Sequence, residues 1–296
     1  MTEIGIVGLD TSHAEAFASV LDEMADVTVS GVWDGNAVRS DEYVEAFCRD
    51  NRATRYDDVA ALAESVDAAM VLTVDWESHV PLATTFLDAG LPTMVDKPIA
   101  GTVDDLSRLT AATQNAPLFG GSAVPFHRSF ADFPRGGRGR TLYAAGFNDY
   151  FYYRVHLTDT IRFLAGQNWT RVKRAAEPGT TVDVEFENHT HATLRFDGSP
   201  DDGMFSVLDV GETTNAVAIE SNRDSLAAMY HPFIESFLDV VAGERDDTDR
   251  LLDAATLQLA VEATIDTGDA ITPESEALAA ISVDSAPFLA DYNPYY

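Results

Sequence analysis

The chain has 296 residues and a formal net charge of -30, from 49 Asp plus Glu against 19 Lys plus Arg. Such an acidic surface repels phosphate backbones and anionic bilayers, which argues against nucleic acid and membrane partners. The same composition predicts adaptation to molar salt, where the Debye length falls to about 3 Å and self-repulsion is screened. An ordinary acidic mesophilic protein is the alternative.

The rest of the composition is that of a globular protein, and the length predicts two domains. The start, MTEIGIVGL, has no basic region or long apolar stretch, and no window reaches about 18 uninterrupted apolar residues. We therefore expect a cytoplasmic protein. The single cysteine, Cys48, excludes an internal disulfide, and its helical spacing from Val44 and Phe47 predicts a core position.

From residue 1 to 120, short apolar runs alternate with helical patterns. Apolar residues recur at helix spacing in segments 17–24 and 82–87. The predicted strands are 3–9, 27–34, 68–74, 92–96 and 117–120. Strands separated by helices of this length predict a doubly wound parallel sheet of the Rossmann type, which binds ligands outside the carboxyl ends of its strands.

From residue 121 to 296 the pattern changes. A Gly/Arg-rich loop, FPRGGRGRT, precedes alternating segments joined by turns such as Asp197-Gly198 and Asp202-Gly203. The predicted strands are 181–186, 192–196, 205–210 and 216–220, and the predicted helices are 156–165, 231–242 and 250–266. The sequence therefore predicts a second α/β domain with a largely antiparallel sheet.

The turn after the first predicted strand, GIVGLDTSHAEAF, matches a GxGxxG dinucleotide fingerprint at one glycine of three. Gly8 takes the first position, whereas Asp10 and His13 take the second and third. A carboxylate at the second position disfavours a pyrophosphate, although Asp10 or Ser12 can instead cap the following helix. The fingerprint is weak by itself.

The second predicted strand ends in Asp34, 26 residues after Gly8. A dinucleotide fold places an acid near this point, where it accepts hydrogen bonds from the adenosine ribose. An acid there repels a 2′-phosphate, so the position favours NAD over NADP. A turn or helix-capping aspartate is the alternative interpretation.

Lys97 is one of only two lysines in the chain, and it follows the apolar segment PTMVD immediately before Pro98. A lysine kept at a strand end in a chain that has almost none predicts a chemical role.

Residues 56–102, which lead into Asp96-Lys97-Pro98, resemble the glucose-fructose oxidoreductase, inositol dehydrogenase and rhizopine-catabolism (Gfo/Idh/MocA) family up to its Glu-Lys-Pro motif. HLTDTIRFLAG at 156–166 resembles the helix of the family's active-site histidine, and PFIESFLDVVAGE at 232–244 its late helix. The resemblance implies an N-terminal Rossmann domain, a C-terminal α/β domain with a large open antiparallel sheet, and NAD(P)-dependent chemistry on sugars or polyols.

By this resemblance, Lys97 and Pro98 match the catalytic lysine and its proline, and Asp96 replaces the usual Glu. His79 matches a histidine after the third main strand, and His156 matches the histidine of the DxxxH motif.

Tyr152 stands where that motif has its first acid. Its phenol is a poor base, although it can donate a hydrogen bond, and Asp149 or Asp159 can replace the missing carboxylate. The aromatic segment 150–153 is either a wall on which a sugar stacks or part of the core sheet.

The implied reaction transfers a hydride between nicotinamide and a sugar, polyol or related small hydroxy or carbonyl compound. His156 exchanges the hydroxyl proton, and Lys97 polarises the oxygen. The predicted catalytic residues are Lys97, His156 and Tyr152, and the predicted cofactor-binding residues are Gly8, Asp10, Thr11, Ser12, His13, Asp34, Thr73, His79, Asp96, Lys97 and Pro98.

NAD is the expected cofactor, and NADP is the less favoured one. The alternative function is a catalytically silent relative that binds a dinucleotide or sugar for regulation. The resemblance also implies a homo-oligomer, a dimer or a tetramer. His189 and His191 alternate on a predicted strand, but no carboxylate partner is assignable, so no metal site is predicted.

Overall fold

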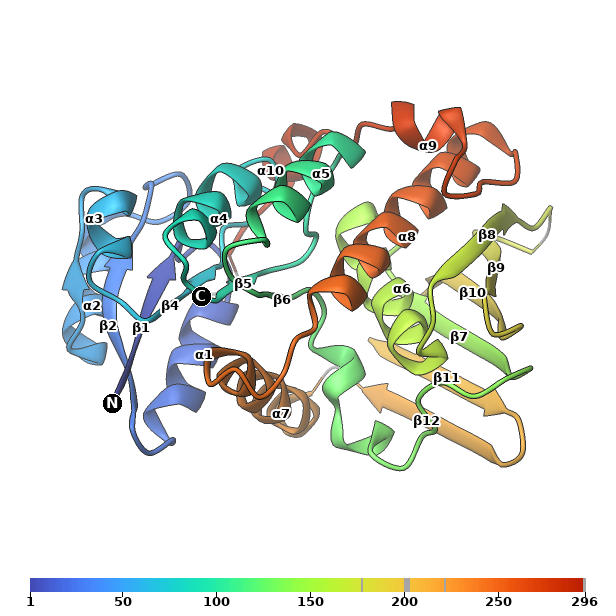
Figure 1. The fold of residues 1–296 in the computed structure, drawn as a ribbon, viewed down its shortest axis with the longest axis horizontal. Helices are drawn as coiled ribbons and strands as arrows, with labels where there is room; N and C mark the ends of the chain where they lie inside the picture. Colours follow the sequence, from blue (N-terminus) through green and yellow to red (C-terminus); the bar gives the residue numbers. More distant parts are fainter. Residues whose placement is uncertain (177, 200–202, 221, 295–296) are drawn as a thin grey trace.

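The computed structural model describes residues 1–176, 178–199, 203–220 and 222–294. Two sheets lie at the two ends of its long axis, with helices between and beside them (Figure 1).

The first sheet is parallel throughout, in the order β3-β2-β1-β4-β5-β6. Its strands are β1 (Thr2–Val7), β2 (Val27–Trp33), β3 (Thr54–Arg55), β4 (Ala68–Val71), β5 (Thr93–Val95) and β6 (Leu118–Gly120). Its helices are α1 (His13–Asp22), α2 (Asp41–Asn51), α3 (Val59–Ala63), α4 (His79–Asp88) and α5 (Val103–Ala112). The strand order reverses between β1 and β4, which is where an open α/β sheet binds its ligands.

All five strands predicted for this sheet are confirmed, but several end earlier than predicted. Residues 8–9, 34, 72–74 and 96 belong to the loops at the carboxyl ends of the strands. All of these residues are buried, and Leu9, Leu72 and Val74 are apolar, so the segments resemble the strands they follow. β3 was missed because a strand of two residues is too short to show an alternation of apolar and polar residues.

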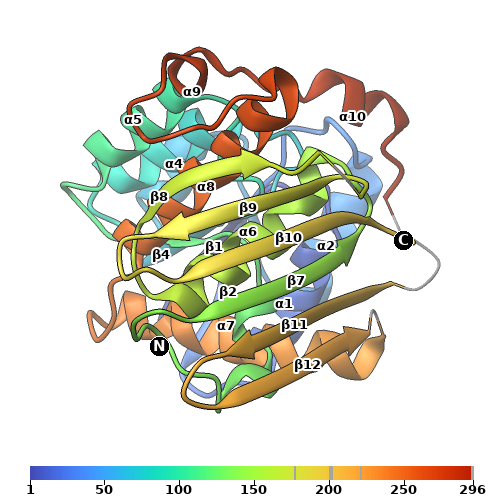
Figure 2. The ribbon, with the colours of Figure 1, turned by 90° about the vertical axis from the view of Figure 1, so that its right-hand side faces the viewer.

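The second sheet has the order β12-β11-β7-β10-β9-β8, and only its β7–β10 pair is parallel among the described strands. Its strands are β7 (Thr141–Phe147), β8 (Trp169–Arg174), β9 (Thr181–Phe186), β10 (His191–Gly198), β11 (Met204–Val210) and β12 (Thr214–Glu220). Helices cover its inner face, and its outer face is open (Figure 2). The fold is therefore the predicted one, a Rossmann-type sheet joined to an open, mostly antiparallel sheet.

The sequence missed β7 and β8. In β7 the outward positions Tyr143 and Ala145 are apolar, so no apolar–polar alternation marks the strand. The predicted turn Asp197-Gly198 is wrong, because both residues lie within β10. The other predicted turn includes Asp202, which lies outside the described residues.

The remaining helices are η1 (Val124–Phe126), η2 (Arg128–Phe130), α6 (Phe151–Ala165), α7 (Arg223–Val241), α8 (Thr248–Thr267), α9 (Glu276–Ala280) and α10 (Ala286–Asp291). α8 packs on α6 and β8 of the second sheet and on α5 and β6 of the first. α6 begins at Phe151 rather than at 156, so the aromatic segment 150–153 forms the start of a helix. Its interpretation as part of the core sheet is wrong.

A single apolar core runs through both sheets, and Cys48 is buried in it as predicted. After α9 the chain returns to the first sheet, where Ser282 pairs with Thr102. In the described part of the chain, no helix combines the length and apolar character needed to cross a membrane.

Candidate functional site

Gly8 makes the tight turn at the end of β1. Its φ is +87°, and a Cβ there would lie 2.5 Å from Cγ2 of Thr73 and 2.9 Å from the Thr73 nitrogen. Only glycine therefore allows the β1 turn to pack against the loop after β4.

Asp10 faces away from the start of α1. Its Oδ2 accepts a hydrogen bond from the Val74 N–H at 3.0 Å, and burial raises the pKa of its carboxyl to about 6. Ser12 holds the N-cap position of α1 without a side-chain capping bond. The prediction that Asp10 or Ser12 caps α1 is therefore wrong, and the Asp10 carboxylate does not occupy the helix N-terminus.

Asp34 ties the end of β2 to the β1 turn. Its Oδ2 accepts from the Leu9 N–H and its Oδ1 from the Asn36 N–H, each at 2.7 Å. Arg39 donates from Nε to the Leu9 carbonyl at 2.9 Å. Asp34 thus has the turn role that the sequence left open as an alternative to ribose binding.

His13 and Asp96, the two departures from the expected motifs, contact each other. His13 Nδ1 lies 2.7 Å from Asp96 Oδ2, and Asp96 Oδ1 accepts from the Lys97 N–H at 2.7 Å. Burial alone would raise the pKa of Asp96, but the charges and hydrogen bonds of His13 and Lys97 outweigh it and lower that pKa. The pair joins the start of α1 to the end of β5.

Lys97 is 4% exposed, and its Nζ lies 3.1 Å from the centroid of the Tyr152 ring and 5.7 Å from that of Tyr153. Burial lowers the pKa of this ammonium to about 7, against the opposing effect of Asp96. Tyr152 therefore offers its ring face to the cation where a carboxylate was expected.

His156 projects from α6 into the same pocket as Lys97. Its Nδ1 lies 2.8 Å from Ser122 Oγ, in the loop after β6. Burial, together with the positive charges of Lys97 and His13, lowers the pKa of His156 well below its ordinary value. The imidazole is therefore neutral at neutral pH.

Neither candidate substitute for the missing acid takes part in this pocket. Asp159 accepts from the Ser122 N–H at 2.9 Å and pairs with Arg250. Asp149 pairs with Arg154 at 2.7 Å. Asp159 thus supports His156 indirectly, because it fixes Ser122.

His79 lies behind the pocket and not in it. The side chain is fully buried, and its two ring nitrogens each lie 2.8 Å from a backbone carbonyl oxygen, one of Thr73 and one of Pro98. His79 therefore joins the loops after β4 and β5 and stabilises the backbone that carries Lys97.

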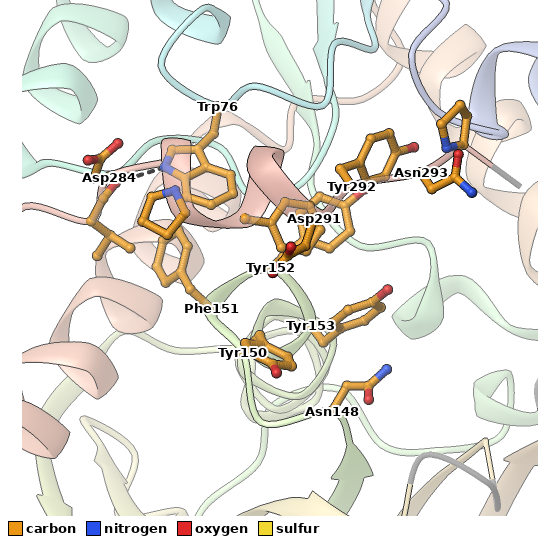
Figure 3. Close-up of a pocket in the computed structure, with 14 residues that line it drawn as sticks. Trp76, Asn148, Tyr150, Phe151, Tyr152, Tyr153, Asp284, Asp291, Tyr292 and Asn293 are labelled. Atoms are coloured by element: carbon orange, nitrogen blue, oxygen red, sulfur yellow. Dashed lines mark hydrogen bonds between the residues drawn. The ribbon is translucent and has the colours of Figure 1, made fainter. Parts of the chain in front are cut away.

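A pocket of about 510 Å³ lies between the two sheets. It brings together Thr11, Ser12, His13, Lys97, Tyr152 and His156 of the predicted residues, whereas Gly8, Asp10, Asp34, Thr73, His79, Asp96 and Pro98 do not line it. Tyr153 of the predicted aromatic segment also lines it, as does Tyr292. Sequence reasoning missed the other polar and aromatic lining residues, which are Phe147, Asn148, Phe205, Glu220 and Tyr230. A second hollow adjoins it (Figure 3).

The described residues contain no group of three or more His, Cys, Asp or Glu side chains placed to hold a metal ion. His189 has a φ of +60° in the turn before β10, whereas His191 lies in that strand, so the two do not alternate along one strand.

The fold combines a parallel sheet of the nucleotide-binding type with an open, mostly antiparallel sheet. Residues 2–119 match the model of the Gfo/Idh/MocA oxidoreductase family, described as having an NAD-binding Rossmann fold. The match covers the parallel-sheet part of the chain and ends within β6.

Solved structures share the fold over nearly the whole chain. The myo-inositol dehydrogenase of Lactobacillus casei, in complex with NAD(H) and myo-inositol, is 14% identical with a TM-score of 0.75, covering 93% of this chain and 97% of its own. The scyllo-inositol dehydrogenase of the same organism, with NAD(H) and scyllo-inositol, is 14% identical with a TM-score of 0.74, covering 93% of this chain and all of its own.

A curated protein of Salmonella typhimurium, YceM, which is named as an oxidoreductase, is 34% identical over 128 residues. The match spans 43% of this chain and 39% of that relative.

Proposed function

We propose that the protein is an NAD-dependent oxidoreductase that transfers a hydride between nicotinamide and a hydroxyl-bearing carbon of a sugar or polyol. The observation that carries this proposal is the shared pocket of Lys97 and His156, beside the N-terminus of α1. The inositol dehydrogenases of the same fold support the substrate class.

The residues around α1 fit a dinucleotide. The Thr11 and Ser12 hydroxyls line the pocket at a helix N-terminus, a position that favours phosphate groups. The Asp10 carboxylate accepts a hydrogen bond from the Val74 N–H and does not line the pocket, so the repulsion expected from the sequence is reduced. Bound NAD supplies the hydride acceptor at this site.

The chain's own residues handle the alcohol proton and the oxygen. In the tautomer of His156 that carries its hydrogen on Nδ1, the Nδ1–H donates a hydrogen bond to Ser122 Oγ. Nε2 is then free of hydrogen, so in the oxidation direction it accepts the proton of the substrate hydroxyl. The Lys97 ammonium polarises the same oxygen, and the Tyr152 ring holds that ammonium in place. The His13–Asp96 pair positions Lys97 through its backbone.

The alternative, a catalytically silent relative, is disfavoured because both proton-handling groups face one pocket. A panel of polyols and sugars with NAD in molar KCl, followed at the absorbance band of reduced nicotinamide, tests the two. Turnover with at least one compound is expected. NAD binding without turnover of any compound would favour the silent relative.

The rate should fall above neutral pH. Lys97 acts as the charged form, and with a pKa of about 7 it loses its proton as the pH rises through that value. The lowered pKa of His156 keeps it neutral in this range, so it does not cause the decline. We expect kcat/KM for alcohol oxidation to decrease above about pH 7. The residual activity of Lys97→Arg should not decrease above pH 7, because the guanidinium stays charged. If the decrease persists unchanged in this variant, another group causes it.

We further propose a cytoplasmic protein adapted to molar salt, on the basis of its net charge of -30. Because salt screens the self-repulsion of this charge, Tm should rise by about 10 °C or more between 0.1 and 3 M KCl. Differential scanning calorimetry measures the change. Equal stability in dilute buffer would contradict the proposal.

We also propose a homo-oligomer that associates through the outer face of the second sheet. Figure 2 shows this face uncovered by helices. Tyr143 and Leu208 lie opposite each other on neighbouring strands and are exposed, as is Val210 two residues along β11. Light scattering in molar KCl should show a dimer or a tetramer, and Leu208→Asp should reduce the mass. A monomeric wild type would contradict the proposal.

A further inference from the structure

The hollow beside the Lys97 pocket has a role that the proposed reaction leaves unassigned. It measures about 830 Å³ and lies between the start of α6 and the C-terminal segment 283–294 (Figure 3). We call it the aromatic pocket, because its lining includes Trp76, Tyr150, Phe151, Tyr152, Tyr153, Phe288 and Tyr292.

The lining combines ring faces with uncharged and acidic hydrogen-bonding groups. Tyr150 is 64% exposed at the rim, opposite the C-terminal segment, and Asn148 lies beside it (Figure 3). Asp284 and Asp291 supply carboxylates, and no Lys or Arg belongs to the described lining. A sugar ring meets these requirements, since its C–H face packs on an aromatic ring while its hydroxyls reach carboxylates and amides. A negatively charged ring does not.

Hydrogen bonds within the chain hold the pocket wall in place. The Trp76 indole N–H donates to the Val283 carbonyl at 2.8 Å, the dashed line in Figure 3. Ser285 Oγ donates to Asp75 Oδ1 at 2.6 Å, and the Tyr292 hydroxyl donates to the Asp10 carbonyl at 3.0 Å. The C-terminal segment is therefore anchored at both ends, to the loops after β4 and β1.

The two pockets adjoin each other. Asn148, Tyr152, Tyr153 and Tyr292 line both. The Tyr152 ring stacks on Phe288, with 4.3 Å between the ring centroids, and also contacts Lys97. A ligand with one ring at Lys97 thus has room for a second ring in the aromatic pocket.

We infer that the substrate is a two-ring glycoside, whose reacting ring faces Lys97 and His156 while a neutral or aminated sugar ring occupies the aromatic pocket. This inference rests on the proposed function. It restricts the substrate class from free sugars and polyols to glycosides. Tyr150 then acts as a specificity residue that contacts the second sugar ring.

The test compares matched one-ring and two-ring probes. Glucose, galactose and glucosamine are measured against maltose, cellobiose, lactose and chitobiose, with NAD in molar KCl, for wild type, Tyr150→Ala and the control Arg108→Ala. At least one disaccharide should have a kcat/KM about tenfold above that of every monosaccharide. Tyr150→Ala should reduce that value about three- to tenfold and leave monosaccharides within twofold. Arg108→Ala, exposed on α5, should change neither.

Binding measured by calorimetry separates this inference from the proposed function. If no probe is turned over, preferential disaccharide binding that is weakened by Tyr150→Ala still supports the pocket, and the proposed reaction alone fails. Equal kcat/KM and equal affinity for one-ring and two-ring probes, or binding of none, would overturn the inference. The inference would also be overturned if Tyr150→Ala weakened the binding of NAD or of monosaccharides as much as that of disaccharides.

Discussion

Lys97→Ala should reduce kcat/KM by about a thousandfold while NAD affinity stays within about threefold of wild type. The ammonium is buried over the Tyr152 ring and faces the pocket, so its removal takes away the only lysine charge at the reacting oxygen. Steady-state rates and titration calorimetry with NAD measure the two quantities.

The chain offers a matched control for this substitution. Lys173, the other lysine, is exposed on β8, and Lys173→Ala should leave both quantities unchanged. Lys97→Ala enzyme that retained a tenth or more of wild-type kcat/KM would contradict the assigned role. A loss of NAD binding that matched the loss of rate would instead make Lys97 a cofactor ligand.

His156→Ala should lower kcat by about a hundred- to ten-thousandfold, the usual contribution of a positioned general base. The side chain is neutral at neutral pH, and Ser122 orients it, so it is ready to accept a proton. His156→Gln keeps a polar side chain of similar reach without a base and should be equally impaired.

Ser122→Ala serves as the positioning control. It removes the hydroxyl that contacts His156 and leaves the imidazole, so an intermediate loss in kcat is expected with little change in KM. If His156→Ala retained most of the wild-type kcat, another group would have to exchange the proton. Calorimetric melting of each variant separates these losses from unfolding.

The sequence revealed the parts of the site that depend on local pattern. Lys97 stood out because lysine is nearly absent from the chain, and His156 was found through the resemblance of its helix to that of the family. The structure places both residues in the lining of one pocket. The two-sheet fold followed from apolar runs and their spacing, except for β3, β7 and β8. The outward side chains of β7 are apolar like its inward ones.

The contacts that complete the site join distant parts of the chain. His13 and Asp96 each departed from an expected motif, and only the structure shows that they are partners 83 residues apart. Tyr292 reaches the Asp10 carbonyl across 282 residues. Such contacts are set by the packing of the two sheets and the return of the C-terminal segment, so no local pattern marks them. The loop after β6 supports His156 through Ser122. Its one local signal in the sequence was Gly121 next to Ser122.

Titration calorimetry of NAD into the protein in molar KCl tests the central claim most directly. The account predicts saturable binding of one NAD per chain. Binding of neither dinucleotide would contradict the claim that Lys97 and His156 form an NAD-dependent oxidoreductase site.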